Sequence, residues 1–359
     1  MSYTNGLDKP SDYFETLTWT GADTSAGRDF TGVGFQPDWV WCKTRSVGNG
    51  HKLFDSVRGV GKSLQSEGTG AEVTNDGNGY IDSFDSDGFS SIAGSSNNYN
   101  FNISSETIVA WNWKAGTSFT NDASSTGIGN IDSTGSVNTD AGFSVISYTG
   151  DANADNTVAH GLGSVPKMII LKNRSISSNW MVYHASTGAQ APLFLNLGNA
   201  AGSGDPDRFK VVPTSSVFTP GTAQEGNGSG NSIIAYCFAD VKGYSKVGGS
   251  YTGNGNANGS YIHLGFAPAF VLIKNADAGE AWQMFDNKRL SFNQTNGRYS
   301  LNPNSNAAEY TGAPLIDFLS NGFKLRTDTN SLNVAQNYIY MAFAENPFVT
   351  STGVPATAR

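Results

Sequence analysis

Charged residues and cysteines are both scarce in this sequence. Asp, Glu, Lys and Arg make up only 14% of its 359 residues, whereas about 25% is usual for a globular protein. The formal net charge of −8 gives no general attraction to nucleic-acid phosphates or anionic lipids, so no nucleic-acid partner is expected. Cys42 and Cys237, the two cysteines, are expected to be reduced thiols in apolar surroundings, which excludes a disulfide framework.

Long apolar runs and helix signals are also missing. No apolar stretch approaches about 18 residues, so no insertion into a membrane is expected. The first six residues lack the basic and apolar regions of a secretory signal, which predicts synthesis in a cytoplasm without export by that route. Only residues 53–64 space their apolar side chains like a helix, and Gly59 and Gly61 within them disfavour one.

What the sequence does contain is a pattern that occurs three times. A proline opens an apolar run that ends in lysine at residues 37–43, 166–172 and 268–274, and a Thr-Gly pair precedes each run. About 75 residues after each proline comes a second apolar run, which contains Trp113, Phe238 or Phe343. A period of roughly 100 residues favours domain duplication over a solenoid, whose units are shorter.

We place the three domains at residues 11–116, 142–243 and 244–348. The segment 117–141 between the first two is rich in Gly, Ser, Thr and Asn, which predicts an extended linker. The second and third domains follow one another almost directly, so we expect them to pack together. The polar C-terminal residues 349–359 are interpreted either as a loose tail or as an arm on a neighbouring subunit.

The fold class follows from the strand-like segments. They are short, rich in β-branched or aromatic residues and bounded by Gly, Asn, Asp or Pro, which is typical of antiparallel strands joined by turns. We therefore predict an all-β protein of three tandem, related antiparallel β-sandwich domains with a jelly-roll-like form. Trp111 with Trp113, Tyr236 with Phe238, and Met341 with Phe343 occupy aligned positions. This bulky apolar column predicts a core layer.

Four stretches of the chain point to a family. Residues 53–59, 141–150, 160–170 and 338–345 resemble a family of tailed-bacteriophage virion proteins, especially those of marine and cyanobacterial phages. Members are described as tail fibre or structural proteins, or only as domains of unknown function. The resemblance covers nearly the whole chain. It implies a virion component made in the cytoplasm of a bacterial host, and it supplies no catalytic residues.

Motifs for nucleotide or metal binding are incomplete. Residues 56–63 approach a phosphate-binding loop, but Ser56 stands where the first glycine is required, so we interpret them as a glycine-rich turn. Residues 151–156 begin like a calcium loop, but the equivalent residues 254–259 carry amides, which favours a hairpin turn. The remaining metal candidate is an acidic cluster of Asp82, Asp85 and Asp87. We predict no metal site and no cofactor.

Enzyme chemistry is not expected either. The four histidines, His51, His160, His184 and His263, fall in no recognised nucleophile motif. Glycoside hydrolysis stays open as an alternative, because it needs only two carboxylates at a suitable distance. Asp55 with Arg58 and Asp286 with Arg289 recur at aligned positions, and we interpret each as a structural ion pair that closes a turn. We therefore predict no catalytic residues.

Three aromatic residues are the candidate binding contacts. Trp180 and Trp282 align with each other and with His51, and we interpret them either as contacts to a glycan or another chain, or as the edge of the core. Tyr99 lies among serines and asparagines and is the candidate for an exposed contact.

Together with the resemblance, these observations predict a non-enzymatic structural component of a bacteriophage virion, either a tail fibre or appendage or a capsid decoration. The protein would act by assembling with itself, as a homo-oligomer, and with other virion proteins, because a low charge density reduces the cost of burying its surface. The alternative is a receptor-binding module that recognises host cell-surface glycans.

Overall fold

The computed structural model describes residues 6–22, 26–96, 101–289, 293 and 299–356. Most of the regular structure in these residues is strand, with short helical segments at Pro10–Asp12, α1 (Ala123–Thr126) and α2 (Gln224–Asn227). All strand pairs of the described sheets are antiparallel, which confirms the prediction of an all-β antiparallel protein. No described helix has the length and apolar character to cross a membrane.

The first unit, residues 14–113, contains a four-stranded sheet. Its order is β1 (Phe14–Thr20), β9 (Thr107–Trp113), β3 (Trp39–Thr44) and β4 (Lys52–Asp55). A small sheet contains β2 (Arg28–Thr31), β8 (Gly88–Ile92) and β7 (Tyr80–Asp85), and a further pair is β5 (Lys62–Ser63) with β6 (Val73–Thr74). Strands β3 and β4 are buried along their whole length, so both of their faces are covered by protein.

The second unit, residues 117–238, has a seven-stranded sheet. Its order is β10 (Thr117–Asn121), β11 (Ser133–Asn138), β12 (Phe143–Thr149), β18 (Ser232–Phe238), β14 (Met168–Asn173), β15 (Trp180–His184) and β16 (Leu193–Phe194). A two-stranded sheet contains β13 (Val158–Ala159) and β17 (Val217–Phe218).

The third unit, residues 245–347, returns to four main strands. Their order is β19 (Ser245–Thr252), β25 (Asn337–Pro347), β21 (Phe266–Asn275) and β22 (Gln283–Asp286). The small sheet here contains β20 (Tyr261–His263), β24 (Gly322–Leu325) and β23 (Ile316–Leu319).

The register makes the three units comparable residue by residue. In the first unit Trp39 pairs with Trp113 on one side and with Asp55 on the other. Met168 pairs in the same way with Phe238 and His184, and Phe270 with Phe343 and Asp286. The order β1-β9-β3-β4 therefore recurs as β12-β18-β14-β15 and as β19-β25-β21-β22.

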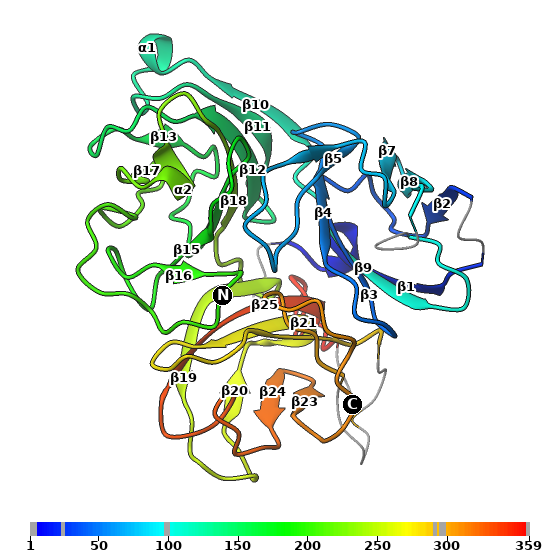
Figure 1. The fold of residues 1–359 in the computed structure, drawn as a ribbon. Helices are drawn as coiled ribbons and strands as arrows, with labels where there is room; N and C mark the ends of the chain where they lie inside the picture. Colours follow the sequence, from blue (N-terminus) through cyan, green and yellow to red (C-terminus); the bar gives the residue numbers. More distant parts are fainter. Residues whose placement is uncertain (1–5, 23–25, 97–100, 290–292, 294–298, 357–359) are drawn as a thin grey trace.

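One apolar cluster lies where the three main sheets meet (Figure 1). Trp39 stacks on Tyr236 of the second unit, with ring centroids 4.5 Å apart, and Phe238 meets Phe343 of the third unit at 6.0 Å. The third unit returns to the first through Phe270, 5.9 Å from Trp111. The aligned column of bulky residues expected from the sequence belongs to this central cluster, which confirms its prediction as a core layer.

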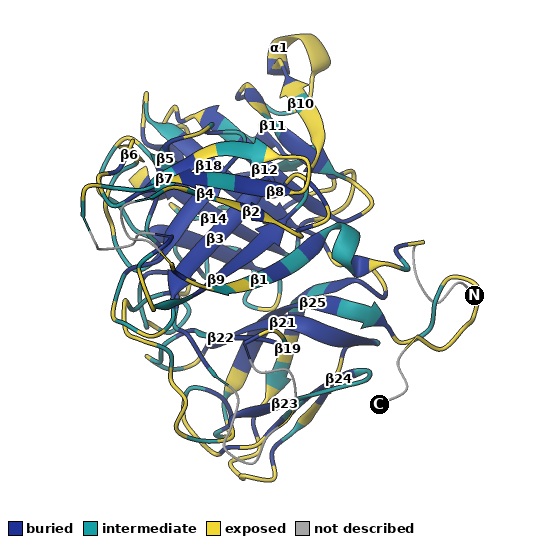
Figure 2. Cartoon of the chain, turned by 90° about the vertical axis from the view of Figure 1, so that its right-hand side faces the viewer, coloured by how far each residue is buried: buried dark blue, intermediate teal, exposed yellow. Residues whose placement is uncertain are grey.

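The opposite face of each main sheet faces a cluster of its own. In the first unit Val40, Cys42 and Ala110, which alternate with the tryptophans, contact Phe30 and Phe89 of the small sheet. The second and third units have equivalent separate clusters. The central strands of the main sheets, such as β3, β14 and β21, are therefore buried on both faces, as the dark blue strands in Figure 2 show.

Residues 117–141 differ from the expected extended linker. They form β10, α1 and β11, and β11 pairs with β12 over Ser133–Asn138. Ile131 and Val137 of this segment contribute to the apolar cluster of the second unit. Since the backbone of the segment can pair with an existing sheet edge, its Gly, Ser and Thr content does not prevent strand formation.

The C-terminal residues described, up to 356, contact the N-terminal segment of the same chain. Ser351 donates its backbone N–H to Asp8 at 2.7 Å. Over these residues the segment is therefore held to its own chain by at least this hydrogen bond.

Candidate functional site

The two tryptophans proposed as binding contacts are buried. Trp180 at the start of β15 is 0% exposed and Trp282 just before β22 is 1% exposed. A ring without accessible surface cannot stack on a sugar, so their interpretation as glycan contacts is wrong, and the alternative of a core position is the one observed. Tyr99 lies outside the described residues.

Each of these tryptophans links its unit to a neighbour. Trp180 Nε1 donates to the carbonyl of Gln65 in the first unit at 2.8 Å, and Trp282 Nε1 donates to the carbonyl of Phe194 in the second unit at 3.0 Å. Their aligned partner His51 lies 3.0 Å from the carbonyl of Asn302 in the third unit. The three equivalent positions thus join the units in a closed cycle.

The state of His51 follows from its hydrogen bonds. Its Nδ1 accepts from Trp41 Nε1 at 2.8 Å, so Nε2 carries the proton that it donates to Asn302. Burial, together with the charge of Lys43, holds the pKa of His51 well below its ordinary value. The ring is therefore neutral at physiological pH and serves as a fixed link rather than as a proton carrier.

The carboxylates of Asp55 and Asp286 also lie at junctions between units. Asp55 pairs with Arg58 and Asp286 with Arg289, which confirms the predicted ion pairs, although both pairs are buried rather than exposed. Burial opposes the ionisation of Asp286, but Arg289 outweighs it and the pKa of Asp286 lies below its ordinary value. These carboxylates are therefore committed to neighbouring cations.

Two glutamates extend the ion pairs across the junctions between units. At the first–second junction Glu72 accepts from Arg58 at 3.2 Å and from Arg174 of the second unit at 2.8 Å. At the third–first junction Glu309 accepts from Arg289 at 2.7 Å and from Arg45 of the first unit at 2.9 Å. Each glutamate is thus held between two arginines, one from each unit. Glu72, Arg174, Glu309 and Arg45 were not identified from the sequence.

The acidic segments considered for calcium form turns. Asp151 accepts from Asn153 N at 2.9 Å and from the side chain of Asn227 at 3.2 Å, as an Asx turn does. Asp87 accepts from Gly32 N at 3.1 Å and from Gly34 N at 2.6 Å. Within the described ranges, no three His, Cys, Asp or Glu side chains converge as a metal site requires.

The segment that resembles a phosphate-binding loop and the two cysteines lie among structural contacts. Residues 56–63 follow β4 and enter β5, and Lys62 donates to Thr74 at 2.6 Å, so this segment lacks the helix of a phosphate-binding loop. Cys42 and Cys237 are buried and free. Burial raises the pKa of Cys237 to about 12, so its thiol is protonated and weakly nucleophilic at neutral pH.

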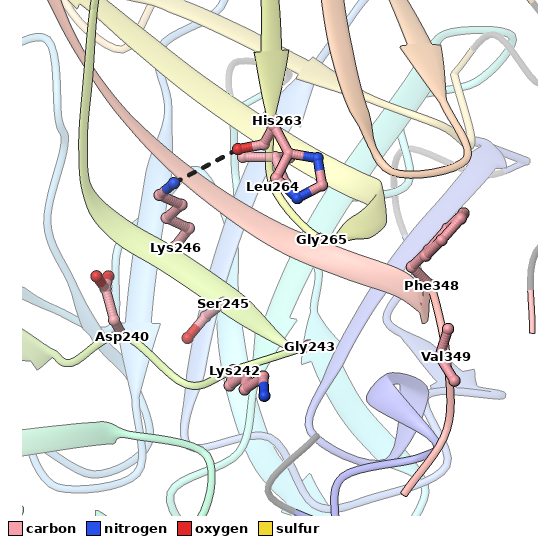
Figure 3. Close-up of a pocket in the computed structure, with 10 residues that line it drawn as sticks. All are labelled: Asp240, Lys242, Gly243, Ser245, Lys246, His263, Leu264, Gly265, Phe348 and Val349. Carbon is pink, nitrogen blue, oxygen red and sulfur yellow. Dashed lines mark hydrogen bonds between the residues drawn. The ribbon is translucent and has the colours of Figure 1, made fainter. Parts of the chain in front are cut away.

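A surface groove of about 570 Å³ lies between the start of β19 and the end of β25 (Figure 3). Its lining combines Lys242, Lys246 and His263 with the apolar Leu264 and Phe348. Lys246 donates to the carbonyl of His263 at 3.4 Å, and Asp240 accepts the backbone N–H of Val247 at 2.6 Å. The groove is thus bordered by residues that also hold β19 in place.

A family model described as a domain of unknown function, DUF7483, matches residues 9–347, and the chain therefore belongs to that family. No curated protein and no solved structure matches the chain.

Proposed function

We propose that this member of the DUF7483 family is a non-enzymatic structural component of a bacteriophage virion. The observation that carries the proposal is the closed cycle of contacts around the central cluster. Side chains that could serve catalysis, such as Asp55, Asp286 and His51, are buried in that cycle as links between units. The resemblance of four stretches of the chain to phage virion proteins supports the same role.

The proposed architecture is three tandem β-sandwich domains around a common core. In each unit a main sheet and a small sheet have an apolar cluster between them, which is how a sandwich buries its inner face. The proposed domain limits are 11–116, 117–243 and 244–348, because β10 and β11 pair into the main sheet of the second domain. Such a body is stiff, because moving one domain would break contacts to both others.

The proposed partners are copies of the same chain and other virion proteins, in a tail fibre or appendage or in a capsid decoration. Two measurements test this: mass spectrometry of purified particles that encode the chain, and light scattering of the purified protein. We expect the chain to be present in mature particles and to self-associate. A chain that is absent from particles and strictly monomeric would overturn the proposal.

Host glycan recognition is retained as the second candidate because of one exposed aromatic residue. Tyr261 is 46% exposed, and its hydroxyl group donates to the side chain of Asn321 at 2.6 Å. An aromatic face beside an amide is a suitable sugar contact. A glycan array with the wild type and Tyr261→Ala tests it, since a binding signal that the substitution removes is required.

A further inference from the structure

The second–third junction differs from the other two. At all three junctions the same backbone hydrogen bond is made, from Glu72 N to Arg174 O at 2.9 Å, from Glu309 N to Arg45 O at 2.7 Å, and from Ala201 N to Ala276 O at 2.8 Å. Ala201 therefore stands where the other junctions have a glutamate, and Ala276 stands where they have an arginine.

A second arginine is missing at the same place. Arg58 and Arg289 each lie three residues after an aspartate, Asp55 or Asp286, and the equivalent of these aspartates is His184. Three residues after His184 comes Thr187. Each of the other junctions thus has two arginines and one glutamate. At the second–third junction the equivalent residues are one threonine and two alanines.

The replacement leaves a cavity of about 680 Å³. Its lining includes Thr187, Ala201 and Ala276, together with Ser250, Asp277 and Asn337. Asp277 is the one charged residue in this lining, and it is exposed. Among the residues that line the cavity there is thus one negative charge and no cation.

At the first–second junction Arg174 has hydrogen-bond acceptors around it, and the equivalent positions in the cavity lining also carry acceptors. Ser147 accepts from Arg174 at 3.4 Å, and its counterpart Ser250 lines the cavity. Asp277 occupies the position equivalent to that of Ser175. Ser175 Oγ accepts the backbone N–H of Ser232 at 2.9 Å, and Asp277 accepts the backbone N–H of Asn337, the equivalent of Ser232, at 2.8 Å. A neutral hydroxyl group is thus exchanged for a carboxylate beside the vacant arginine position.

We propose that this cavity binds a guanidinium group, supplied by free arginine or by an arginine side chain of a partner protein. The ligand would occupy the space that Arg174 and Arg45 fill at the other junctions and would donate to Asp277 and Ser250. Charge-assisted hydrogen bonds to a carboxylate favour a guanidinium over a neutral group of the same shape. This inference goes beyond a structural role and does not depend on a virion location.

The test measures the melting temperature and binding isotherms of the full chain at constant ionic strength. L-arginine is compared with L-citrulline, a neutral molecule of nearly the same shape. We expect arginine to bind with a dissociation constant of about 1 mM, the strength of a few such bonds, and citrulline to bind at least about tenfold more weakly. Equal binding of the two, preference for a neutral sugar such as glucose, or no binding at all would overturn the proposal.

Two variants locate the site. Asp277→Asn should weaken arginine binding about tenfold, because it removes the charge and keeps the shape. The double variant Ala201→Glu with Ala276→Arg rebuilds the pair found at the other junctions and should abolish binding. Arginine binding that persists unchanged in either folded variant contradicts the assignment.

A matched control uses the first–second junction and does not require the double variant to fold. Arg174→Ala opens an equivalent space beside Glu72, so the melting temperature of this variant should rise with added guanidinium ion more than that of the wild type, and urea should not reproduce the effect. Failure of this rescue would show that the junctions cannot take a guanidinium from solution, which would overturn the proposal.

The source of the ligand is decided with a blocked Gly-Arg-Gly peptide and its citrulline counterpart. Binding of the arginine peptide at least as tight as that of free arginine supports a partner side chain. Binding of free arginine alone supports the amino acid. Binding of neither overturns the proposal.

Discussion

Tyr236 donates its hydroxyl proton to Asp55 Oδ2 at 2.7 Å across the first–second junction. At the third–first junction the counterpart of Tyr236 is Trp111, whose Nε1 donates to Asp286 Oδ2 at 3.0 Å. At each of these junctions a carboxylate is neutralised by an arginine of its own unit and oriented by a donor from the next unit. The ion pair therefore contributes to the alignment of two units as well as to the closing of a turn.

Tyr236→Phe should destabilise the protein by about 1.5–3 kcal/mol, the usual cost of losing a hydrogen bond to a charged group. The ring stays in place on Trp39, so packing changes little. Urea unfolding measures the difference. Tyr251→Phe is the control, because its hydroxyl group donates to a neutral carbonyl, that of Leu332 in the same unit, at 2.7 Å. A loss at Tyr236 no larger than that of the control would contradict a special role for the Asp55 contact.

Trp180→Ala should cost about 3–5 kcal/mol, as for other large buried aromatic residues. The substitution opens space in the central cluster and leaves the carbonyl of Gln65 without its donor. Trp180→Phe should cost less, because most of the ring volume is kept. Both are measured by chemical unfolding. Full stability of the alanine variant would be inconsistent with the position of Trp180 in the core.

The repeat and the strand content could be predicted from the sequence, because both are local patterns. The alternation of Trp111 and Trp113 with Asn112 identifies a strand with one bulky face, whatever that face contacts. The sequence does not show that this face meets two other units rather than a partner sheet of its own. That outcome depends on long-range packing, which also places Trp180 inside the protein.

The sequence indicates the charged residues at the junctions less clearly. Arg45 and Arg174 both lie six residues after the aligned Trp39 and Met168, so a comparison of the repeats could have identified them. Glu72 and Glu309 lie in loops whose lengths differ between repeats, and alignment alone does not match them. The linker prediction for 117–141 was wrong because composition reports flexibility of an isolated chain, whereas an available sheet edge supplies hydrogen-bond partners.

Acid should destabilise the protein between about pH 6.5 and pH 4. Burial lowers the pKa values of His160 and His184 to about 4. As the pH is lowered below about 6.5, these histidines take up protons in the unfolded chain but not in the folded chain. The free energy of unfolding therefore decreases as the pH decreases, by up to about 3 kcal/mol for each histidine. His184→Asn, which does not titrate, should reduce this slope. An unchanged slope in the variant would contradict the assignment.

Alkali should have the opposite effect through three equivalent lysines. Lys43, Lys172 and Lys274 lie four residues after Trp39, Met168 and Phe270, and each ammonium group donates to backbone carbonyls. Burial lowers the pKa of each to about 8. Because an unfolded lysine keeps its proton to about pH 10.4, these three groups contribute a free energy of unfolding that rises with pH above about pH 8.

The rise is at most about 1 kcal/mol per lysine for each pH unit, and it should be measured between about pH 8 and 9.5, before exposed tyrosines of the unfolded chain ionise. Urea midpoints at several pH values give the slope. Lys274→Met removes one titrating group and should lower the slope by up to about 1 kcal/mol for each pH unit. If the slope of Lys274→Met equals that of the wild type, the carbonyl contacts offset the burial of the Lys274 ammonium group, and its lowered pKa does not hold.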